Sequence, residues 1–573
     1  MVARGDPGTP PVRGKGEAHL VQRDRAFHAV SLLPDRADTG PTGEESTVPT
    51  DSLPDRPDIE QLKGNAKSLR DLVRAGVDGA VALVRDHHPR LAELTSGTPD
   101  AIGFKLADAQ LTLARHYGFV SWPRLRRHVG LVNRLTRSPH EQATGGPLID
   151  DDARADELLR LACLNYGADS RARWERSRRL VADHPQLSRR SLFTAAAVGD
   201  VAAAGEILAR DAAAASVEGG PFRWPPLLYL TYSRFELPGD TAGAGRDAVA
   251  VARKLLEHGA DPNAGFLWDG LPSPFTALTG VFGRGEQAAP PHRDELTLAR
   301  VLLEAGAEAN DSQTIYNRGA GDIARDDTDF LELLLDFGLG RGDGGPWHRM
   351  LSPAHQTPVE IAAEALQHAA ESGLVQRARL LLSRGADPNE PGTHPGYRGR
   401  SPYAGAVLHG NLEVAAMLAA VGADTSGVDV FGRFVGACLA GDGAAVDDAL
   451  GRDPGLLDRA RAERGDLVAR ATEMERPAAI ELLVALGFDV NARHRTTALH
   501  EAAWRGNVAI VTLLVGLGAD PTIVDAEHDS TPRGWAAHGG HTAVVELLDR
   551  LAPRPRSGSI PIRLRSSSGG TTD

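Results

Sequence analysis

Near its C-terminus the chain repeats a sequence pattern with a period of 34 residues, and this period limits the folds available to it. One copy reads Thr-Ala-Leu-His-Glu-Ala-Ala-Trp-Arg-Gly-Asn from Thr497 and continues with Ile-Val-Thr-Leu-Leu-Val-Gly-Leu-Gly-Ala-Asp from Ile510. The next copy starts at Thr531 with Thr-Pro-Arg-Gly-Trp-Ala-Ala-His-Gly-Gly-His. A unit of this length cannot bury its apolar face alone, so it must stack on neighbouring units.

Each position of the repeat has a structural reason that predicts two antiparallel helices. Thr497 precedes the first helix, where a hydroxyl can accept bonds from unpaired backbone amides. Ala502 keeps that helix narrow enough for close stacking, and Gly506 stands where the chain reverses and a positive φ is favoured. Val511 and Leu514 give the second helix an apolar stripe.

This period and these motif residues resemble the ankyrin repeat. The resemblance implies an all-α fold: an ankyrin-repeat α-solenoid, here preceded by a small helical module and flanked by disordered termini. In such an array the motif residues build the stack, so the motif settles the architecture and leaves the function open.

The array is predicted to extend far upstream, from 154 to 552, with about ten or eleven helix pairs, several of them degenerate. A helix-ending Gly-Ala-Asp or a close relative recurs at Gly259, Gly306, Gly385, Gly422, Gly487 and Gly518. Two of the gaps are about twice a repeat long, which predicts one hidden unit ending near Gly338 and another ending at Asp453-Pro454. Insertions at 238–246, 283–293 and 341–355 are expected at loop tips along one edge.

Composition divides the remainder of the chain. Residues 1–57 and 553–573 are rich in Pro, Gly and charged residues without periodicity, and are expected to be disordered. Residues 58–140 are interpreted as a separate basic helical module with helices at 58–74, 78–88, 106–117 and 122–135. A GTG codon reads as Val inside a longer frame but can also initiate translation. We therefore expect translation to start often at Val48, which stands immediately before Pro49 to Pro57, where the resemblance to known proteins begins.

Three segments resemble a group of bacterial ankyrin-repeat proteins with an N-terminal helical extension. They are Phe104-Lys-Leu-Ala-Asp-Ala-Gln with the following Leu113 to Leu125, then Trp224 to Arg234, and Pro274 to Gly280. The resemblance implies an ankyrin-repeat protein from a GC-rich bacterium. It implies no catalytic residues and no cofactor.

Charge and cysteine usage exclude several protein classes. The formal charge is −13, and no run of 18 apolar residues exists that could span a membrane. The start of the chain lacks the apolar segment of a signal peptide. Cys163 and Cys438 are too few and too far apart for a disulfide framework or a cysteine zinc site, so we expect a cytoplasmic protein, and a monomer.

The predicted function is a non-enzymatic scaffold or adaptor that binds an unidentified protein partner through the concave face of the solenoid. The candidate contact residues are Phe266, Trp268, Tyr397, Arg398, His494, Arg495, Glu501, Trp504 and Arg505. The alternative is a regulatory nucleic-acid binder acting through 58–140, which carries 13 basic and 8 acidic residues. That module could equally dock on the acidic solenoid of its own chain. No sequence motif supports an enzyme.

Other clusters have a functional and a structural interpretation. The aromatic residues between Phe222 and Phe235 could line a ligand pocket beside Arg234 or fill the core. His87, His88, His116 and His128 could be metal ligands but lack a completing Cys or carboxylate. The aspartates between Asp322 and Asp329 lack the glycine and glutamate of a calcium loop and are interpreted as a solvated acidic loop, so no metal is predicted.

Overall fold

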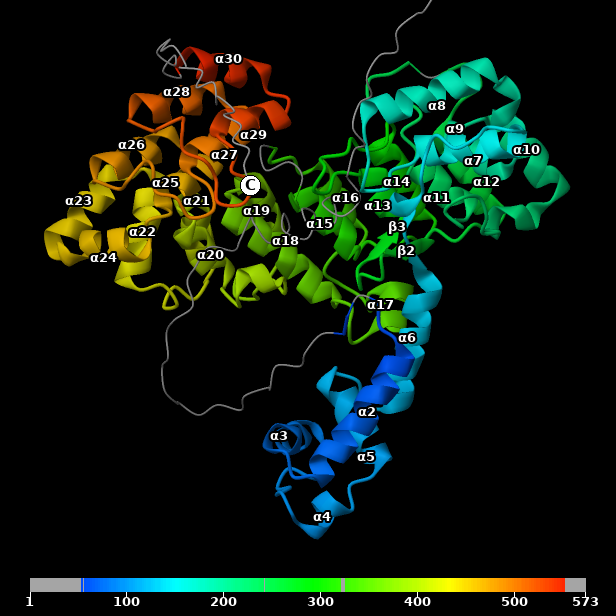
Figure 1. Cartoon of the computed structure of the whole chain (residues 1–573). Helices are drawn as coiled ribbons and strands as arrows, with labels where there is room; N and C mark the ends of the chain where they lie inside the picture. The colour runs from blue at the N-terminus through cyan, green and yellow to red at the C-terminus, as the bar shows by residue number, and fades with distance from the viewer. Residues whose placement is uncertain (1–52, 55, 242, 321–324, 552–573) are drawn as a thin grey trace, which may run out of the picture. The chain divides into compact units, whose positions relative to one another are not determined.

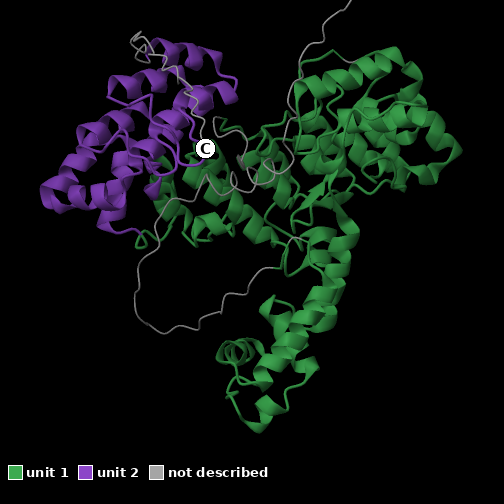
Figure 2. Ribbon diagram, viewed as in Figure 1, with its two compact units in different colours: residues 1–406, 413–427 green, residues 407–412, 428–573 purple. Residues whose placement is uncertain are grey.

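The computed structural model describes residues 53–54, 56–241, 243–320 and 325–551. They fall into two compact units (Figure 2), Met1–Ala406 with Glu413–Gly427 and Val407–Leu412 with Val428–Asp573. Regular structure in the described residues is almost entirely helical, which confirms the predicted all-α class. The expectations for the tails and for Val48 lie outside the described residues, apart from a few positions just before 58.

The N-terminal part of the first unit is a small helical module (Figure 1). Its helices are α2 (Ile59–Arg74), α3 (Asp78–His87), α4 (Pro99–Ile102), α5 (Leu106–His116) and α6 (Trp122–Leu135). Four of these lie where periodicity placed them, and α4 is an addition begun by a Thr98 cap and Pro99. The core of the module contains Leu69, Val84 and Phe104.

Successive helix pairs form the array of the first unit. The pairs are α7 (Asp151–Ala162) and α8 (Arg171–Asp183), α9 (Leu192–Val198) and α10 (Val201–Arg210), α11 (Pro226–Thr231) and α12 (Ala248–Glu257), α13 (Ala277–Phe282) and α14 (Glu295–Glu304), α15 (Ser312–Ala320) and α16 (Asp329–Asp336), and α18 (Pro358–Ser372) and α19 (Val375–Ser383). The first helices contact one another in chain order from α7 to α18, as do the second helices from α10 to α16. Short 3₁₀ turns lie at η1 (Pro139–Glu141), η2 (Pro185–Arg189), η3 (Ala212–Ser216) and η4 (Pro395–Tyr397).

The second unit repeats the same construction. After α20 (Pro402–Leu408) and α21 (Leu412–Ala420), where the chain alternates between the units, come α22 (Val430–Ala440) and α23 (Gly443–Arg452), α24 (Gly455–Glu463), α25 (Leu467–Glu473) and α26 (Pro477–Ala485), α27 (Ala498–Arg505) and α28 (Val508–Gly516), and α29 (Pro532–His538) and α30 (Thr542–Leu551). We call the first helix of each pair its inner helix. The inner helices α22, α25, α27 and α29 contact each other in order. Their small side chains, such as Ala471, Ala502 and Ala536, lie in one buried core.

The glycines that suggested helix ends do end helices. Gly259, Gly306, Gly338, Gly385, Gly422, Gly487 and Gly518 follow the second helices with φ between 84° and 106°. A side chain with a Cβ is strained in this left-handed region, so the recurrence of glycine marks each helix end in the sequence. Gly338 therefore ends a degenerate pair, as predicted from the long gap.

A three-stranded sheet joins the module to the array within the first unit. β1 (Thr136–Arg137) follows α6 directly and pairs in parallel with β2 (Gly265–Trp268), which pairs antiparallel with β3 (Pro274–Thr276). The insertion 341–355 folds into α17 (Gly345–Leu351), whose Trp347 and Leu351 pack with Val132 of α6. This insertion therefore covers an apolar joint and is not an open loop.

The prediction that the three insertions share one edge is wrong. Residues 238–246 and 283–293 lie between the two helices of a pair, at the C-terminal end of an inner helix. Residues 341–355 lie between two pairs, after α16 and before the N-terminal end of the inner helix α18. Among the described helices none has the length and apolar composition that a bilayer crossing requires.

Candidate functional site

The inner helix α27 places three predicted contact residues on its surface. Ala498, Leu499, Ala502 and Ala503 turn into the core. Glu501 and Trp504 are consequently half-buried and Arg505 is exposed. The helix ends at Gly506, whose φ of 71° starts the reversal to α28.

A polar network fixes the start of α27 to the next loop. The Thr497 hydroxyl lies 2.8 Å from Nδ1 of His500. Nε2 of His500 lies 3.0 Å from the carbonyl oxygen of Ser530. Burial lowers the pKa of His500, so the ring is neutral at physiological pH and can bond on both sides. This network sets the spacing between two repeats.

The loop before α29 is organised by a buried carboxylate. Asp525 accepts hydrogen bonds from the amides of Glu527 at 2.8 Å and His528 at 2.7 Å, and from Nε1 of Trp535 at 2.9 Å. Burial alone would raise the pKa of Asp525, but these bonds favour the charged form and hold it at about 2. The loop is therefore a fixed support for the Trp535 ring.

Two more predicted residues lie on the preceding loop. His494 is exposed and Arg495 is half-buried, with its guanidinium 3.4 Å from the carboxylate of Glu527. The backbone oxygen of Arg495 accepts a 3.0 Å bond from the amide of Ala526. The structure thus places His494 and Arg495 together on the loop before α27, where Arg495 is bonded to the next loop.

Aromatic side chains continue from α27 onto α29. The Trp504 ring stacks on His538 with centroids 5.9 Å apart and an interplanar angle of 23°. It meets Trp535 edge-on, also at 5.9 Å. Trp535 is half-buried and His538 exposed, so these rings present accessible apolar surface beside polar edges.

Aligning the inner helices at their reversals reveals a residue that the sequence did not suggest. The reversal residues Glu475, Gly506 and Gly540 all have positive φ, at 53°, 71° and 75°. Two positions before them stand Glu473, Trp504 and His538, and five positions before them stand Arg470, Glu501 and Trp535. We call these last six residues the inner-face surface. Glu473 was missed because Glu475 takes the place of the expected glycine.

Glu473 carries an unusual carboxylate. Its side chain is half-buried at the end of α25 and has no hydrogen-bond or ion-pair partner among the described residues. Burial and the neighbouring Glu501 raise the pKa of Glu473 to about 7, and Arg470 and Arg505 only partly offset this. A cation next to this carboxylate would lower its pKa and stabilise the charged form.

The predicted contact residues of the first unit are less accessible. Phe266 is 2% exposed and stacks on Trp224 with centroids 4.9 Å apart. Tyr397 is 7% exposed, and burial raises its pKa well above the usual range. As corrections, neither side chain offers surface to a partner, because both pack inside the array. Trp268 is half-buried, and its Nε1 donates to the backbone carbonyl oxygen of Asn165 at 3.2 Å. Arg398 is exposed.

The aromatic run before α12 is core. Phe222, Trp224, Tyr229, Tyr232 and Phe235 are all buried. Arg234 is also fully buried, and its guanidinium donates only to carbonyl oxygens, those of Thr231, Ser233, Gly280 and Pro290. All five rings and the Arg234 side chain are buried, so the structure supports the core interpretation.

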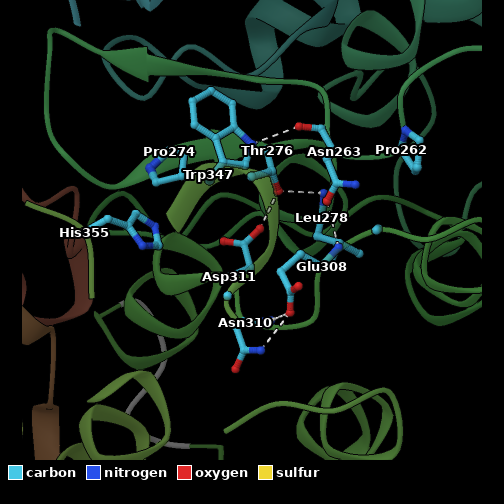
Figure 3. A pocket seen from close by; sticks show the side chains of 12 residues that line it. Pro262, Asn263, Pro274, Thr276, Leu278, Glu308, Asn310, Asp311, Trp347 and His355 are labelled. Atoms are coloured by element: carbon cyan, nitrogen blue, oxygen red, sulfur yellow. Dashed lines mark hydrogen bonds between the residues drawn. The ribbon is translucent and has the colours of Figure 1, made fainter. Parts of the chain in front are cut away.

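A small cavity lies beside β3 and α15 (Figure 3). Its volume of about 10 Å³ has room for one water molecule and excludes an organic ligand. Its wall is a capping network in which Thr276 donates to Asp311, and Asp311 accepts from the amide of Thr314 at 2.9 Å. Burial raises the pKa of Asp311 despite these bonds. The cavity therefore belongs to the contact between repeats.

Charged clusters elsewhere already contain their counter-ions. Ligand atoms of His140, Glu141 and Asp269 lie within 4.8 Å of one another. The guanidinium of Arg56 lies 2.5 Å from Asp269 and 3.7 Å from Glu141, which supplies the positive charge that a metal would bring.

The acidic loop before α16 also has partners, although Asp322 lies outside the described residues. Asp327 forms ion pairs with Arg318 at 2.9 Å and Arg377 at 2.8 Å, and Asp326 accepts from the amide of Arg377 at 3.0 Å. The loop therefore anchors the start of α19 and is less solvated than expected.

The histidines of the module are dispersed over different contacts. His87 and His116 face each other with nitrogens 3.2 Å apart, whereas His88 lies 3.6 Å from Asp108 and His128 packs on Phe119. Two facing imidazoles do not make a ligand set for a structural zinc.

Residues 494–526 match the family model described as Ankyrin repeat. The match contains α27, α28 and the loops that hold His494, Arg495 and Asp525. No curated protein is similar enough to the chain to count as a match. The family match supports an ankyrin-repeat protein, and ankyrin repeats typically act as protein-interaction modules.

Proposed function

We propose that the protein is a non-enzymatic scaffold that binds a protein segment on the inner-face surface of its second unit. The observation that carries this proposal is the half-buried carboxylate of Glu473, which lacks a hydrogen-bond or ion-pair partner among the described residues. Glu473 lies on α25 at the position that corresponds to Trp504 on the adjacent helix α27. A charged group in such surroundings destabilises the free protein unless a counter-charge arrives.

The partner segment is proposed to present a lysine or arginine. Residues 428–551 contain 12 arginines and no lysine against 19 acidic residues, so the unit attracts cations. A basic side chain between Glu473 and Glu501 would offset both carboxylates. The same cation could lie against the Trp504 ring, which adds a cation–π contribution.

Aromatic side chains at such a surface supply most of the remaining affinity. Tryptophan is enriched among residues whose truncation weakens protein interfaces most. Trp504 is held by His538 and Trp535, so little conformational entropy is lost when a partner covers it. His494, Arg495 and Arg505 are proposed as the rim of this surface. Trp268 and Arg398 remain proposals for the first unit.

The proposal does not include catalysis or a cofactor. The perturbed groups described above support helix starts, loops or the inner-face surface. We also propose a cytoplasmic location, because Cys163 and Cys438 are free thiols. Cys163 and Cys438 are both fully buried, and burial raises the pKa of each thiol to about 12.

A peptide-display selection on the full chain tests the proposal. Randomised short peptides enriched on the wild type should contain lysine or arginine next to apolar residues. Trp504→Ala and Glu473→Gln should each raise the dissociation constant of an enriched peptide at least tenfold, which corresponds to about 1.4 kcal/mol of binding free energy. Glu463→Gln is the matched control, since this exposed carboxylate on α24 pairs with Arg459 at 3.0 Å.

Proton release gives a second readout. If a basic side chain reaches Glu473, the pKa of Glu473 falls and its carboxyl group releases a proton on binding near pH 7. Calorimetry in two buffers of different ionisation enthalpy detects this release. Peptides that bind Trp504→Ala, Glu473→Gln and the wild type equally, without proton release, would show that the inner-face surface is not the binding surface.

A further inference from the structure

Helix α6 has an unusual charge distribution for this acidic chain. Its sequence from Trp122 to Leu135 contains no aspartate or glutamate, although the whole chain has a formal charge of −13. Leu125, His128, Val129 and Val132 are buried and attach the helix to its neighbours. The opposite face of α6 is exposed to solvent.

That face carries four exposed arginines. They are Arg124, Arg126, Arg127 and Arg134. Within the described ranges none of their guanidinium groups has a hydrogen bond or an ion pair. The next arginine along the chain, Arg137, by contrast pairs with Glu218 at 2.8 Å. Like charges three or four residues apart destabilise a helix, so α6 is not optimised for its own stability.

Gly130 lies on the same face, between Arg127 and Arg134. It is exposed, has no left-handed backbone, and a Cβ there would meet no atom within 4 Å. Glycine is unfavourable in a helix interior, and packing gives no reason for it here. Its effect is to leave a bare stretch of helix backbone between arginines, where another chain can approach closely.

The start of α6 adds to this positive surface. Ser121 makes no side-chain capping bond, and the first turn has no acidic residue. The positive end of the helix dipole therefore lies uncompensated beside Arg124 and Arg126. Anions are the ligands that such an end attracts.

The contact of α6 with the array does not use the arginines. Val132 and the partly buried Leu135 pack with Trp347 and Leu351, and β1 adds backbone bonds to β2. In the alternative considered from the sequence, the basic module docks on its own acidic solenoid through charge. Arg137 adds one ion pair with Glu218, but the contacts of α6 itself are apolar, and its four arginines stay exposed.

We propose that this face of α6 binds the phosphate backbone of a nucleic-acid duplex. A duplex carries one negative charge per about 1.7 Å, so the roughly 15 Å from Arg124 to Arg134 meets several phosphates whatever the base sequence. The exposed face has no large apolar side chain for anchoring a peptide. Gly130 admits the sugar-phosphate chain against the helix, with Arg127 and Arg134 on either side.

The experiment titrates the full chain onto a labelled mixed-sequence duplex of about 20 base pairs, as DNA and as RNA, between about 50 and 200 mM salt. The logarithm of the binding constant should fall with the logarithm of salt with a slope of about −3 to −4, as for four phosphate contacts. Arg127→Gln and Arg134→Gln should each reduce that slope by about one.

Gly130→Ala distinguishes a contact surface from a diffuse charge effect. It should raise the melting temperature of the module and weaken duplex binding at least threefold. Arg171→Gln is the matched control, because this exposed arginine on α8 pairs with Glu175 at 3.1 Å, and it should bind as the wild type does.

Three results would overturn the proposal. The first is the absence of duplex binding at about 50 mM salt. The second is binding that Gly130→Ala and both α6 arginine variants leave unchanged. The third is an affinity for poly-glutamate, or for phosphatidylserine vesicles, equal to that for the duplex with the same sensitivity to the variants.

Discussion

Two glycines in one repeat should respond to alanine with opposite signs. Gly506 ends α27 with a φ of 71°, and a Cβ there would lie 2.4 Å from Nδ1 of His541. Gly516 is the last residue of α28, has no positive φ, and would have no atom within 4 Å of its Cβ. The two substitutions add the same methyl group at sites ten residues apart.

The magnitudes follow from these geometries. The left-handed conformation costs alanine about 1–2 kcal/mol, and moving the His541 ring adds to it, so Gly506→Ala should destabilise by about 2 kcal/mol. Gly516→Ala removes conformational freedom from the unfolded chain without strain and should stabilise by about 0.5–1 kcal/mol.

Native-state hydrogen exchange is the suitable assay, because a chain with two compact units need not unfold in one step. Amide protection across α27 to α30 should fall in Gly506→Ala and rise in Gly516→Ala, since repeat stability depends on nearest neighbours. The reasoning is refuted if both variants shift protection in the same direction, or if Gly506→Ala leaves α27 to α30 unchanged.

Three further predictions concern polar and aromatic groups. The pKa of Glu473 is raised from 4.5 to about 7, so between these pH values the folded state keeps a proton that the unfolded chain loses, and the unfolding free energy should fall as pH rises. Glu473→Gln should abolish this fall, and urea titration should show the variant to be roughly 1–3 kcal/mol more stable than the wild type at pH 8. Because Trp504 is half-buried, Trp504→Ala should lower the unfolding free energy by about 1–2 kcal/mol, less than a fully buried tryptophan, and a loss above about 3 kcal/mol in the same titration would assign it to the core. Asp311→Ala should cost the first unit about 1–2 kcal/mol by removing the cap at Thr314, whereas Asp311→Asn keeps an acceptor and should cost less, as thermal unfolding will show.

The array was predictable from local chemistry. Glycine is the residue that tolerates the left-handed backbone after each second helix, so Gly259 and Gly338 marked helix ends even where the rest of the motif is lost. The module helices were predictable for a similar reason, because Pro89 and Gly118 interrupt a regular apolar spacing.

The candidate surface was only partly predictable. Trp504 and Arg505 follow from the repeat, but Glu473 does not, because Glu475 adopts the left-handed conformation in place of glycine. Phe266 was predicted to contact a partner, but its ring is buried against other parts of the array, which no local sequence pattern reveals. The covering element includes Trp224, which is remote in sequence.

The pairing of β1 with β2 could not be inferred from the sequence. β1 has two residues, and its partner Trp268 lies more than a hundred residues downstream of Arg137. A strand this short has no periodicity of its own, and its position depends on the packing of Val132 against Leu267.

The positions of the two thiols allow each unit to report its own opening in the native sequence. Cys163 belongs to the first unit, where its thiol donates to the backbone carbonyl oxygen of Tyr229 at 3.6 Å, and Cys438 belongs to the second unit. A thiol reagent can reach either sulfur only when the surrounding helices separate, because both are fully buried. The labelling rates of the two cysteines, resolved by peptide mass, therefore measure two separate opening equilibria without an engineered probe.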